Sequence, residues 1–304
     1  MSLQALPYIV LLGFLFGSTL VVSRFSVSQY APLNYVGLRL LLAALAHAAI
    51  YAISRKRSWS RDPRLWRHAA TLGIIGTAIP NSAIVVSLEY QSSGITAVLI
   101  TTSPAITVLL AHFLLTDEPL TRRKGFGVVV ALAGALLLAL LGESGLPDVS
   151  RADPIGYILV TVAMIFGSGA TIYVRKYMES FDPIDVNSVR MLTATAVVMP
   201  ISLILVGFDV SMVTEKGVAA LFYAAFVGTF CGLILAFYNI QRFGATASAM
   251  TAYIIPIVAA VGGTLLLGEK ITLGMLAGMA LILSGVIIIN REVSTHDEIG
   301  TTGI

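Results

Sequence analysis

Two stretches 151 residues apart decide the fold: PLNYVGLR at residues 32–39 and PIDVNSVR at residues 183–190. In both, a proline opens an apolar run and an arginine is the seventh residue after that proline. Proline is common in the first turn of a helix, because the N–H that it lacks would have no helical partner there. The same signal in each half indicates that the chain contains an internal duplication.

Further matches at nearly the same offset extend the duplication to other segments. They pair Phe16-Gly17-Ser18 with Phe166-Gly167-Ser168, Pro104 with Pro256, Glu118 with Glu269, and Gly134 with Gly285. We therefore predict two structural units, at residues 1–145 and 153–292, followed by a flexible cytoplasmic tail at residues 293–304.

The composition is that of a membrane protein: of the 304 residues, 57% are apolar and 12% are charged. Soluble domains carry about 25% charged residues, roughly twice the share found here. With a mean hydropathy of +0.90, the apolar residues exceed what the core of a soluble protein of this size can bury. A soluble globular enzyme is therefore excluded. The single cysteine, Cys231, excludes an intrachain disulfide and a cysteine-ligated metal site.

Ten apolar stretches are long enough for a helix to cross the roughly 30 Å of bilayer hydrocarbon. They are too long and too continuously apolar for the alternating strands of an outer-membrane barrel. The first lacks the basic start and the cleavage site of a signal peptide, so we take it as a span. We expect an all-α membrane protein with ten transmembrane helices, at residues 6–22, 34–53, 69–88, 95–115, 125–141, 154–174, 186–207, 218–238, 247–268 and 273–289.

Basic residues predict the orientation, since loops rich in lysine and arginine stay in the cytoplasm. With the N-terminus inside, 13 basic residues fall in inner loops and tails, and the outer loops hold only Arg24, Arg151, Lys216 and Lys270. We interpret the basic run at residues 55–67 as a cytoplasmic loop and not as a nucleic-acid site. Both termini are thus predicted to be cytoplasmic. Because each unit has five spans, an odd number, the second unit must be inverted in the membrane.

This arrangement resembles a known family of membrane proteins. A duplicated, inverted five-helix unit, with Pro-x-x-x-x-x-x-Arg opening the second helix of each half and residues 268–272 (GEKIT) after the ninth, resembles the EamA-type ten-helix exporters of the drug/metabolite transporter superfamily. The chain is similar to the bacterial YddG-type amino-acid exporters. The resemblance implies broad export of aromatic and other neutral amino acids across the bacterial inner membrane. A small-molecule substrate and the bilayer are then the partners, and we expect a monomer without a cofactor.

Polar residues at helical spacing are candidates for the substrate pathway, because a zwitterion needs hydrogen-bonding groups on its way through hydrocarbon. Thr77 and Asn81 are four residues apart and share a helix face, and Pro80 beside them frees a backbone carbonyl. The alternative is that serines and threonines in membrane helices pack against neighbours and bond their own backbone. The glycines beside them can equally serve close helix packing. The candidates are Gly17, Ser18, Thr77, Asn81, Ser103, Thr107, Thr161, Ser168 and Tyr253.

Prolines and arginines inside the spans are candidates for gates. Pro80, Pro104 and Pro256 each bend a helix, and the last two are related by the repeat, although a packing kink is the alternative. Arg39 and Arg190 lie about two turns inside their spans, where an unpaired charge is costly. We favour a structural role beside the gates for both arginines, with recognition of a substrate carboxylate as the alternative.

The groups that the spans lack exclude several function classes. No Asp or Glu lies deep in a span, Glu89 being the nearest, and His47 and His112 are isolated. There is no Walker A loop and no zinc-protease motif, so we predict neither catalytic residues nor a metal site. A serine protease built around Ser168 lacks a predictable histidine partner. A channel or a structural membrane protein remains an alternative to a carrier. Without a proton-carrying acid, we expect a carrier that runs down the gradient of its substrate.

Overall fold

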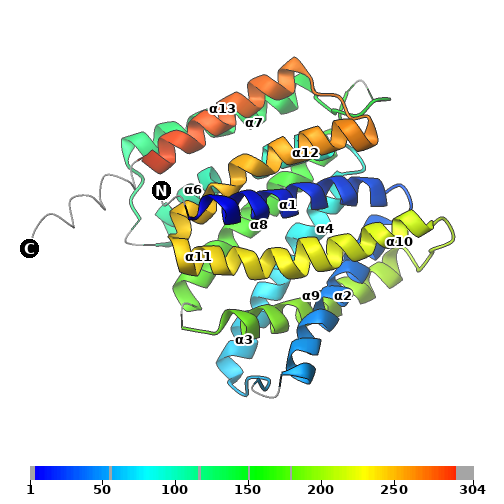
Figure 1. Ribbon diagram of the computed structural model, residues 1–304. Helices are drawn as coiled ribbons and strands as arrows, with labels where there is room; N and C mark the ends of the chain where they lie inside the picture. Colours follow the sequence, from blue (N-terminus) through cyan, green and yellow to red (C-terminus); the bar gives the residue numbers. More distant parts are fainter. Residues whose placement is uncertain (1–3, 55–56, 116–117, 150, 179, 292–304) are drawn as a thin grey trace, which may run out of the picture.

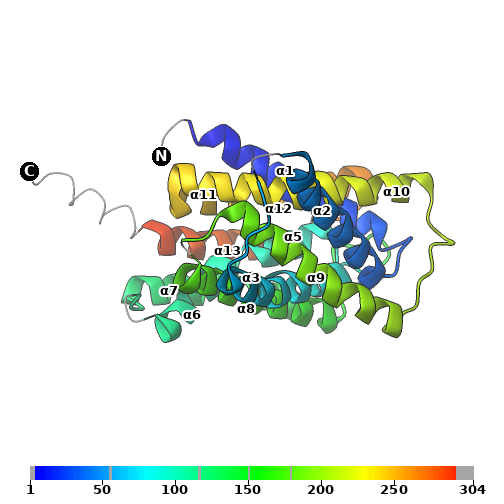
Figure 2. The same ribbon diagram turned by 90° about the horizontal axis from the view of Figure 1, so that it is seen from below.

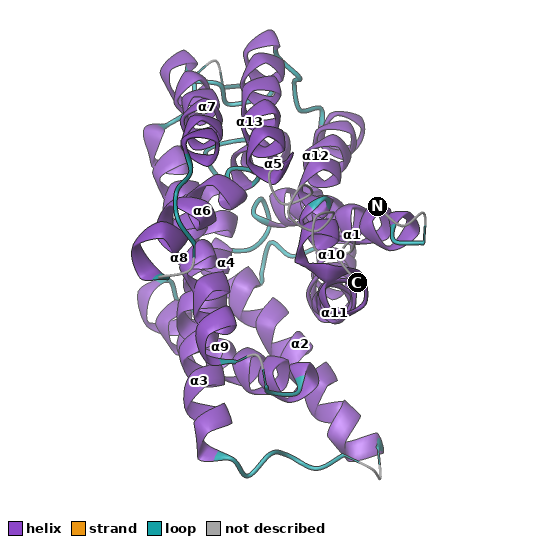
Figure 3. Ribbon diagram, turned by 90° about the vertical axis from the view of Figure 1, so that its left-hand side faces the viewer, coloured by secondary structure: helices purple, strands orange, loops and turns teal. Residues whose placement is uncertain are grey.

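The structure is a computed structural model that describes residues 4–54, 57–115, 118–149, 151–178 and 180–291. Within these ranges all the regular structure is helical (Figure 3). The tail predicted at residues 293–304 lies outside them. The elements are α1 (Leu6–Ser26), α2 (Pro32–Ile53), α3 (Pro63–Gly73), η1 (Ile74–Ala78), α4 (Ile79–Ser87), α5 (Ser93–Ile100), α6 (Ser103–Leu114), α7 (Arg122–Leu141), α8 (Pro154–Tyr177), α9 (Pro183–Leu205), α10 (Glu215–Phe222), η2 (Tyr223–Cys231), α11 (Gly232–Ala249), α12 (Thr251–Leu267) and α13 (Leu273–Arg291), where η marks π-helical segments.

These elements form the ten predicted spans. Three spans are composite: α3, η1 and α4 make the third, α5 and α6 the fourth, and α10, η2 and α11 the eighth. Among the described residues, nine helical runs are long and apolar enough to cross a membrane, and the remaining span, α12, is apolar but shorter. The prediction of an all-α membrane protein with ten spans is therefore confirmed.

Aspartate–proline pairs begin three of the helices. Asp62, Asp153 and Asp182 each precede a proline, and each carboxylate accepts a hydrogen bond from the backbone N–H two residues later. The carboxylate satisfies one free N–H of the first turn, and the proline has no N–H to leave unpaired. Pro183 thus opens α9 as the sequence predicts, and Pro32 opens α2 at the equivalent place.

Two predicted boundaries differ from the structure by more than four residues. The third span begins at Pro63 and not at residue 69, because its first turns are amphipathic: Leu65 is buried while Arg64 and Arg67 are exposed. A search for uncharged residues misses such a turn. The eighth span continues through α11 to Ala249, past its predicted end at residue 238. The polar residues there predict a loop, but none of them is a proline that would stop a helix.

The helices that pack together across the two halves are those expected if a two-fold axis relates the halves. α2 packs against α9 and α7 against α13, so that each pair consists of equivalent helices. α1 packs against α12, and its counterpart α8 packs against α6. Figures 1 and 3 show α7 and α13 side by side at one edge of the bundle. Most helices run in a common direction (Figure 2), as expected of a bundle that crosses a bilayer.

Glycines let α7 and α13 approach closely at two places that the repeat relates. A Cβ atom added at Gly127 would lie 2.7 Å from the carbonyl oxygen of Gly285. One added at Gly134 would lie 2.8 Å from the carbonyl oxygen of Gly278. Each contact is the repeat image of the other, since Gly127 corresponds to Gly278 and Gly134 to Gly285. Small residues at such crossings are typical of membrane helices, whose association depends on close packing.

The first turn of α1 and the last turn of α13 lie at the same end of the bundle (Figure 1). We call this end the termini side and the opposite end the distal side. An even number of spans requires the two turns to share one side. The loop after α2 and the start of α9 also belong to the termini side, and the loops before α5 and α13 to the distal side.

Candidate functional site

A cavity of about 190 Å³ lies between the two halves of the bundle. Both repeat-related arginines, Arg39 and Arg190, line it, together with Thr77 and Asn81 from the third span. The first half supplies its part of the wall from α1, α2, η1, α4 and α5, and the second half from α9, η2, α11 and α12. Its other lining residues are Phe16, Thr19, Leu20, Ser23, Ile84, Val85, Ile100, Met191, Gly228, Thr229, Leu233 and Ile255.

Arg39 reaches the cavity from α2. Its side chain is only 4% exposed. Its Nη2 donates to the Oδ1 of Asn81, and its Nη1 lies 3.3 Å from the Oγ of Ser23. The ring of Tyr35 lies 5.7 Å from the guanidinium carbon, close enough for a cation–π interaction. The Nε of Arg39 is buried and has no partner among the described residues, so one strong donor is left unused.

Arg190 reaches the same cavity from α9. Its Nε donates to the Oγ1 of Thr77, and its Nη2 lies 2.7 Å from the carbonyl oxygen of Gly76. Pro80 has no N–H to donate to this carbonyl, which lies four residues before it. The Gly76 carbonyl, to which Pro80 cannot donate, accepts a hydrogen bond from Arg190. This interaction fixes the arginine against the third span.

π-Helical segments flank the cavity in both halves, at positions that the repeat relates. η1 carries Thr77, and residue 77 corresponds to Gly228 in η2; Asn81 likewise corresponds to Gly232. A Cβ atom at Gly228 would collide with the Oγ1 of Thr19. In the second half, α1 thus packs against the position at which the first half presents Thr77. The third span supplies a polar partner to each arginine: the amide of Asn81 to Arg39 and the hydroxyl of Thr77 to Arg190. π-Helical turns are frequently found at functional sites.

The electrostatics of the cavity favour an anion. Two guanidinium groups line it, and none of the described residues in its wall is an aspartate or a glutamate. Their partners are neutral: an amide, two hydroxyls and a carbonyl. A buried charge without a counter-ion is costly, and a bound carboxylate would reduce that cost. Nor do the described residues offer a group of three His, Cys, Asp or Glu side chains that could hold a metal.

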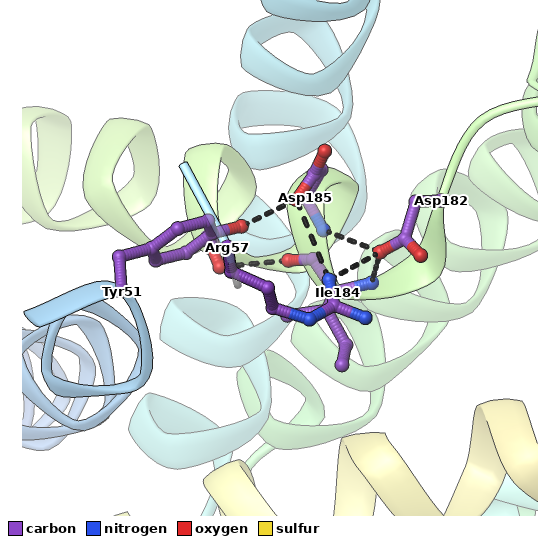
Figure 4. A network of polar contacts seen from close by, with 6 residues as sticks. Tyr51, Arg57, Asp182, Ile184 and Asp185 are labelled. Atoms are coloured by element: carbon purple, nitrogen blue, oxygen red, sulfur yellow. Dashed lines mark hydrogen bonds and ion pairs between the residues drawn. The ribbon is translucent and has the colours of Figure 1, made fainter. Parts of the chain in front are cut away.

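Polar contacts join α2 and α9 at both ends, and they too are images of each other. On the distal side, Ser202 bonds to the Oδ1 of Asn34. On the termini side, the hydroxyl of Tyr51 donates to the Oδ1 of Asp185 over 2.6 Å (Figure 4). Residues 34 and 185, and residues 51 and 202, are equivalent in the repeat. The structure thus gives the α2–α9 pair the same contact at each end, outside the central cavity.

Arg57 adds charge to the contact on the termini side. It forms ion pairs with Asp182 at 3.1 Å and with Asp185 at 3.7 Å. Partial burial alone would raise the pKa of Asp182, but the hydrogen bonds from Arg57 and from the backbone N–H groups of Asp185 and Ile184 lower this pKa below its ordinary value. Asp182 therefore stays ionised throughout the physiological range.

The remaining predicted pathway residues lie outside the cavity wall. Some of them form hydrogen bonds to each other or within their own helix. The Oγ of Ser168 donates to the carbonyl of Ser103 at 3.2 Å, and the Oγ1 of Thr161 donates to the carbonyl of Tyr157. Ser18 contacts the hydroxyl of Tyr223 at 2.9 Å in a separate apolar groove. The other members are Gly17, which packs against Val258, Tyr253, which accepts a hydrogen bond from Asn290, and the partly exposed Thr107.

The predicted gate prolines occupy different settings. Pro104 is in the first turn of α6, directly after the break at Thr101 and Thr102, where it has no helical bond to lose. Pro256 lies inside α12, and the break equivalent to that at residues 101–102 is at Met250. The two histidines inside spans have separate surroundings. His47 is buried and its Nδ1 contacts the Ala43 carbonyl, while the Nδ1 of His112 accepts a hydrogen bond from the Leu120 N–H.

Sequence reasoning missed three polar residues of the wall, Thr19, Ser23 and Thr229, and one buried acid, Glu269. In α1 the polar residues Ser18, Thr19 and Ser23 lie on different sides of one helix, and only contacts with other helices select the two that face the cavity. Glu269 was noted as a repeat match only. Its loop position hides the fact that it is 5% exposed.

Comparisons with known proteins agree with this architecture. The sequence pattern of the EamA-like transporter family matches residues 3–140 and again residues 154–291. An uncharacterized transporter of Archaeoglobus fulgidus is 24% identical over 279 residues, which cover 91% of this chain and 95% of that protein. The uncharacterized inner membrane transporter YedA of Escherichia coli K12 is 28% identical over 261 residues, covering 85% and 81%. A crystal structure with 18% identity has a similar fold, with a TM-score of 0.65 over 94% of this chain and 97% of the other.

Proposed function

Since the chain belongs to the EamA-like transporter family and is a multi-pass membrane transporter, not an enzyme, we propose that it exports small metabolites, amino acids foremost, from a bacterial cytoplasm. The substrate binds in the cavity between the halves and crosses by alternating access, in which rocking of the two repeats exposes one site to each side in turn. The termini side faces the cytoplasm and the distal side the exterior of the inner membrane, and the carrier works as a monomer.

The convergence of Arg39 and Arg190 on one cavity carries this proposal. Because the repeat is inverted, Arg39 and Arg190 lie on helices that begin on opposite sides of the membrane, yet both side chains line the same cavity. A guanidinium group matches a carboxylate in charge and in hydrogen-bond geometry. This favours recognition of a substrate carboxylate over the gate-side role, and every amino acid carries that group.

The neutral lining groups complete the fit to an amino acid. The hydroxyls of Thr77 and Thr229 and the amide oxygen of Asn81 can accept hydrogen bonds from an ammonium group. Apolar residues such as Leu20, Ile84 and Ile255 provide surface for an apolar side chain. With no acid in the described part of the wall, the ammonium is bound less strongly than the carboxylate. A broad range of neutral amino acids is then accommodated.

Transport down the substrate gradient is the simplest energy source for this site. In the described helices, the only acidic residues are Asp185 and Glu215, each in a first turn at a membrane surface. A proton-coupled carrier of this size would need an acid near its cavity whose protonation competes with substrate. Glu89, which the sequence places nearest to a span, is exposed in the loop before α5.

Competition in liposomes tests the proposal. Purified protein is reconstituted, and uptake of a radiolabelled neutral amino acid is measured against excess free amino acids and their carboxyl amides. We expect free amino acids to compete and the amides to compete far less, because the amide removes the negative charge. Arg190→Lys, which keeps the charge but loses the forked geometry, should raise the KM for uptake, while Arg151→Lys in the distal loop serves as the matched control.

Three outcomes would contradict parts of the proposal. Equal competition by amides and free acids would exclude carboxylate recognition. Uptake that does not saturate would indicate a channel. Competition by another metabolite but by no amino acid would point to a carrier of the same fold with a different substrate.

A further inference from the structure

Two glutamates that the repeat relates, Glu118 and Glu269, have different partners in this conformation. Each lies in the loop between the last two spans of its half, followed by a leucine or isoleucine and a threonine. Glu118 is on the termini side and Glu269 on the distal side. Equivalent residues with unequal surroundings show where the two halves differ in conformation.

Glu269 holds the start of a helix in the other half. Its Oε1 accepts a hydrogen bond from the backbone N–H of Ser93 at 2.8 Å, and its Oε2 accepts from the Ser93 hydroxyl at 2.7 Å. The N–H of Gly94 lies 3.3 Å from the same Oε2. These residues begin α5, whose N-terminus attracts negative charge. The carboxylate is buried, so the contact joins the two halves on the distal side.

Glu118 bonds instead to basic side chains. Its Oε1 lies 2.5 Å from the Nη1 of Arg175, in the last turn of α8, and its Oε2 lies 3.5 Å from the Nζ of Lys124. The Glu118 side chain is 32% exposed. This contact is an ion pair at the surface, where such pairs contribute little to stability.

The segment that Glu118 would hold by symmetry is not a helix start in this conformation. Ser93 and Gly94 correspond to Gly244 and Ala245, which lie inside the continuous helix α11. Their backbone N–H groups are therefore not at a free helix end. Glycine is a poor helix former, so residue 244 is a weak point at which α11 can separate into two segments.

The partner that Glu269 would have by symmetry is present but not engaged. Arg175 corresponds to Arg24, in the last turn of α1 on the distal side. Arg24 is within electrostatic range of Glu269 and of Glu89. Among the described residues it forms no ion pair within 4 Å. The distal side thus holds both parts of the ion pair that is closed on the termini side.

We propose that Glu118 and Glu269 are reciprocal latches that exchange partners when the carrier changes sides. In the conformation described, Glu269 holds the start of α5 and keeps the distal side closed, while Glu118 pairs with Arg175. In the opposite conformation, Glu269 pairs with Arg24, and Glu118 holds the N–H groups of Gly244 and Ala245 after α11 has broken there. In a transporter built from inverted repeats, each half takes the conformation of the other when access alternates. This inference rests on the proposed alternating access.

Access to the cavity from the distal side tests the latches without any substrate. Cys231 is replaced by serine, and Thr19, which lines the cavity from α1, by cysteine. The labelling rate with a membrane-impermeant maleimide added from the distal side then reports how often that side opens. Glu269→Gln removes the charge from the buried latch, so labelling should become severalfold faster. Glu118→Gln weakens the opposite conformation more than this one, so labelling should become slower.

The opposite signs of the two effects separate a latch from a general loss of structure. Glu215→Gln, an exposed glutamate in the first turn of α10, is the matched control and should leave the rate unchanged. Ser93→Ala removes one of the three hydrogen bonds to Glu269 and should raise the rate less than Glu269→Gln does; it also serves if the latter variant does not fold. Labelling that changes in the same direction for both glutamates, or that Ser93→Ala leaves at the parental rate, would overturn the proposal. Failure to find a transported amino acid would not affect this readout.

Discussion

Groups of the third span hold the two cavity arginines, Arg39 and Arg190, in position. Thr77, Asn81 and the Gly76 carbonyl freed by Pro80 accept hydrogen bonds from Arg39 or Arg190. The spacing of Thr77, Pro80 and Asn81 was visible in the sequence, as was the symmetry of the arginines. Their convergence on one cavity was not visible in the sequence, because the inverted repeat places the two arginines toward opposite sides of the membrane. Only the depth and tilt of α2 and α9 in the structure bring them together.

The carboxylate of Asp182 predicts how the stability of the folded protein changes with pH. Its carboxylate caps α9 and pairs with Arg57, and its pKa lies below the ordinary value of about 4. A lowered pKa in the folded protein gives stability that is present above the unfolded pKa and is lost as the pH falls through the folded one. We expect Asp182→Asn, which can still cap, to lower the melting temperature slightly at pH 7.

The control for this prediction is Asp182→Ala, which removes the cap as well and should cost about 1 kcal/mol more. Thermal unfolding in detergent measures both variants between about pH 3 and 8. The difference between the parent and Asp182→Asn should shrink below about pH 4. A difference that grows as the pH falls would contradict the assignment.

Among the elements, the α7–α13 crossing is the part of the fold most sensitive to one added carbon. A Cβ atom at Gly285 would lie 2.5 Å from both the carbonyl oxygen of Gly127 and the amide nitrogen of Ala131. Both are backbone atoms that cannot move aside locally, so Gly285→Ala should destabilise the protein by about 1–3 kcal/mol. Gly167→Ala is the matched control, since nothing lies within 4 Å of its Cβ position. Equal melting temperatures for the two variants would show that the helices separate at no cost.

The breaks within the spans are the elements that we expect to move. Pro104 follows the break between α5 and α6, and Pro256 lies in α12 beyond the equivalent break at Met250. Replacing either proline with alanine should slow transport, because a continuous helix resists the bend, while expression and thermal stability stay close to those of the parent. Initial flux in liposomes measures the effect. Normal flux in both variants would reduce the two prolines to packing features.

The sequence predicted the number of spans correctly but did not predict the breaks inside them. Apolar length alone identified ten spans, since the bilayer imposes that length on every helix. The break at Thr101–Thr102 and the π-helical segments depend on contacts between spans, which no local pattern encodes. The run of α11 through the predicted loop has the same cause: residues 239–249 carry no helix-stopping proline, and only the tertiary structure decides whether they stay helical.

For the whole molecule, the distribution of basic residues predicts that both termini face the cytoplasm. Cysteine replacements in the Cys231→Ser background test it with an impermeant label on intact cells. A cysteine at Ser58, on the termini side, should not react from outside, whereas one at Ser211, in the distal loop after α9, should react. Labelling of the Ser58 position from outside would reverse the orientation.

Initial flux into liposomes shows whether this protein carries amino acids down their own gradient through the Arg39–Arg190 cavity. Flux of a labelled neutral amino acid is measured with and without unlabelled amino acid inside, and with and without an imposed pH gradient. We predict that internal substrate accelerates uptake, because a loaded carrier returns faster than an empty one, and that the pH gradient and a protonophore have little effect between about pH 6 and 8. Any residual pH dependence should vanish when His47 or His112 is replaced. Uptake that internal substrate leaves unchanged, or a severalfold stimulation by the pH gradient that survives the loss of both histidines, would contradict this account.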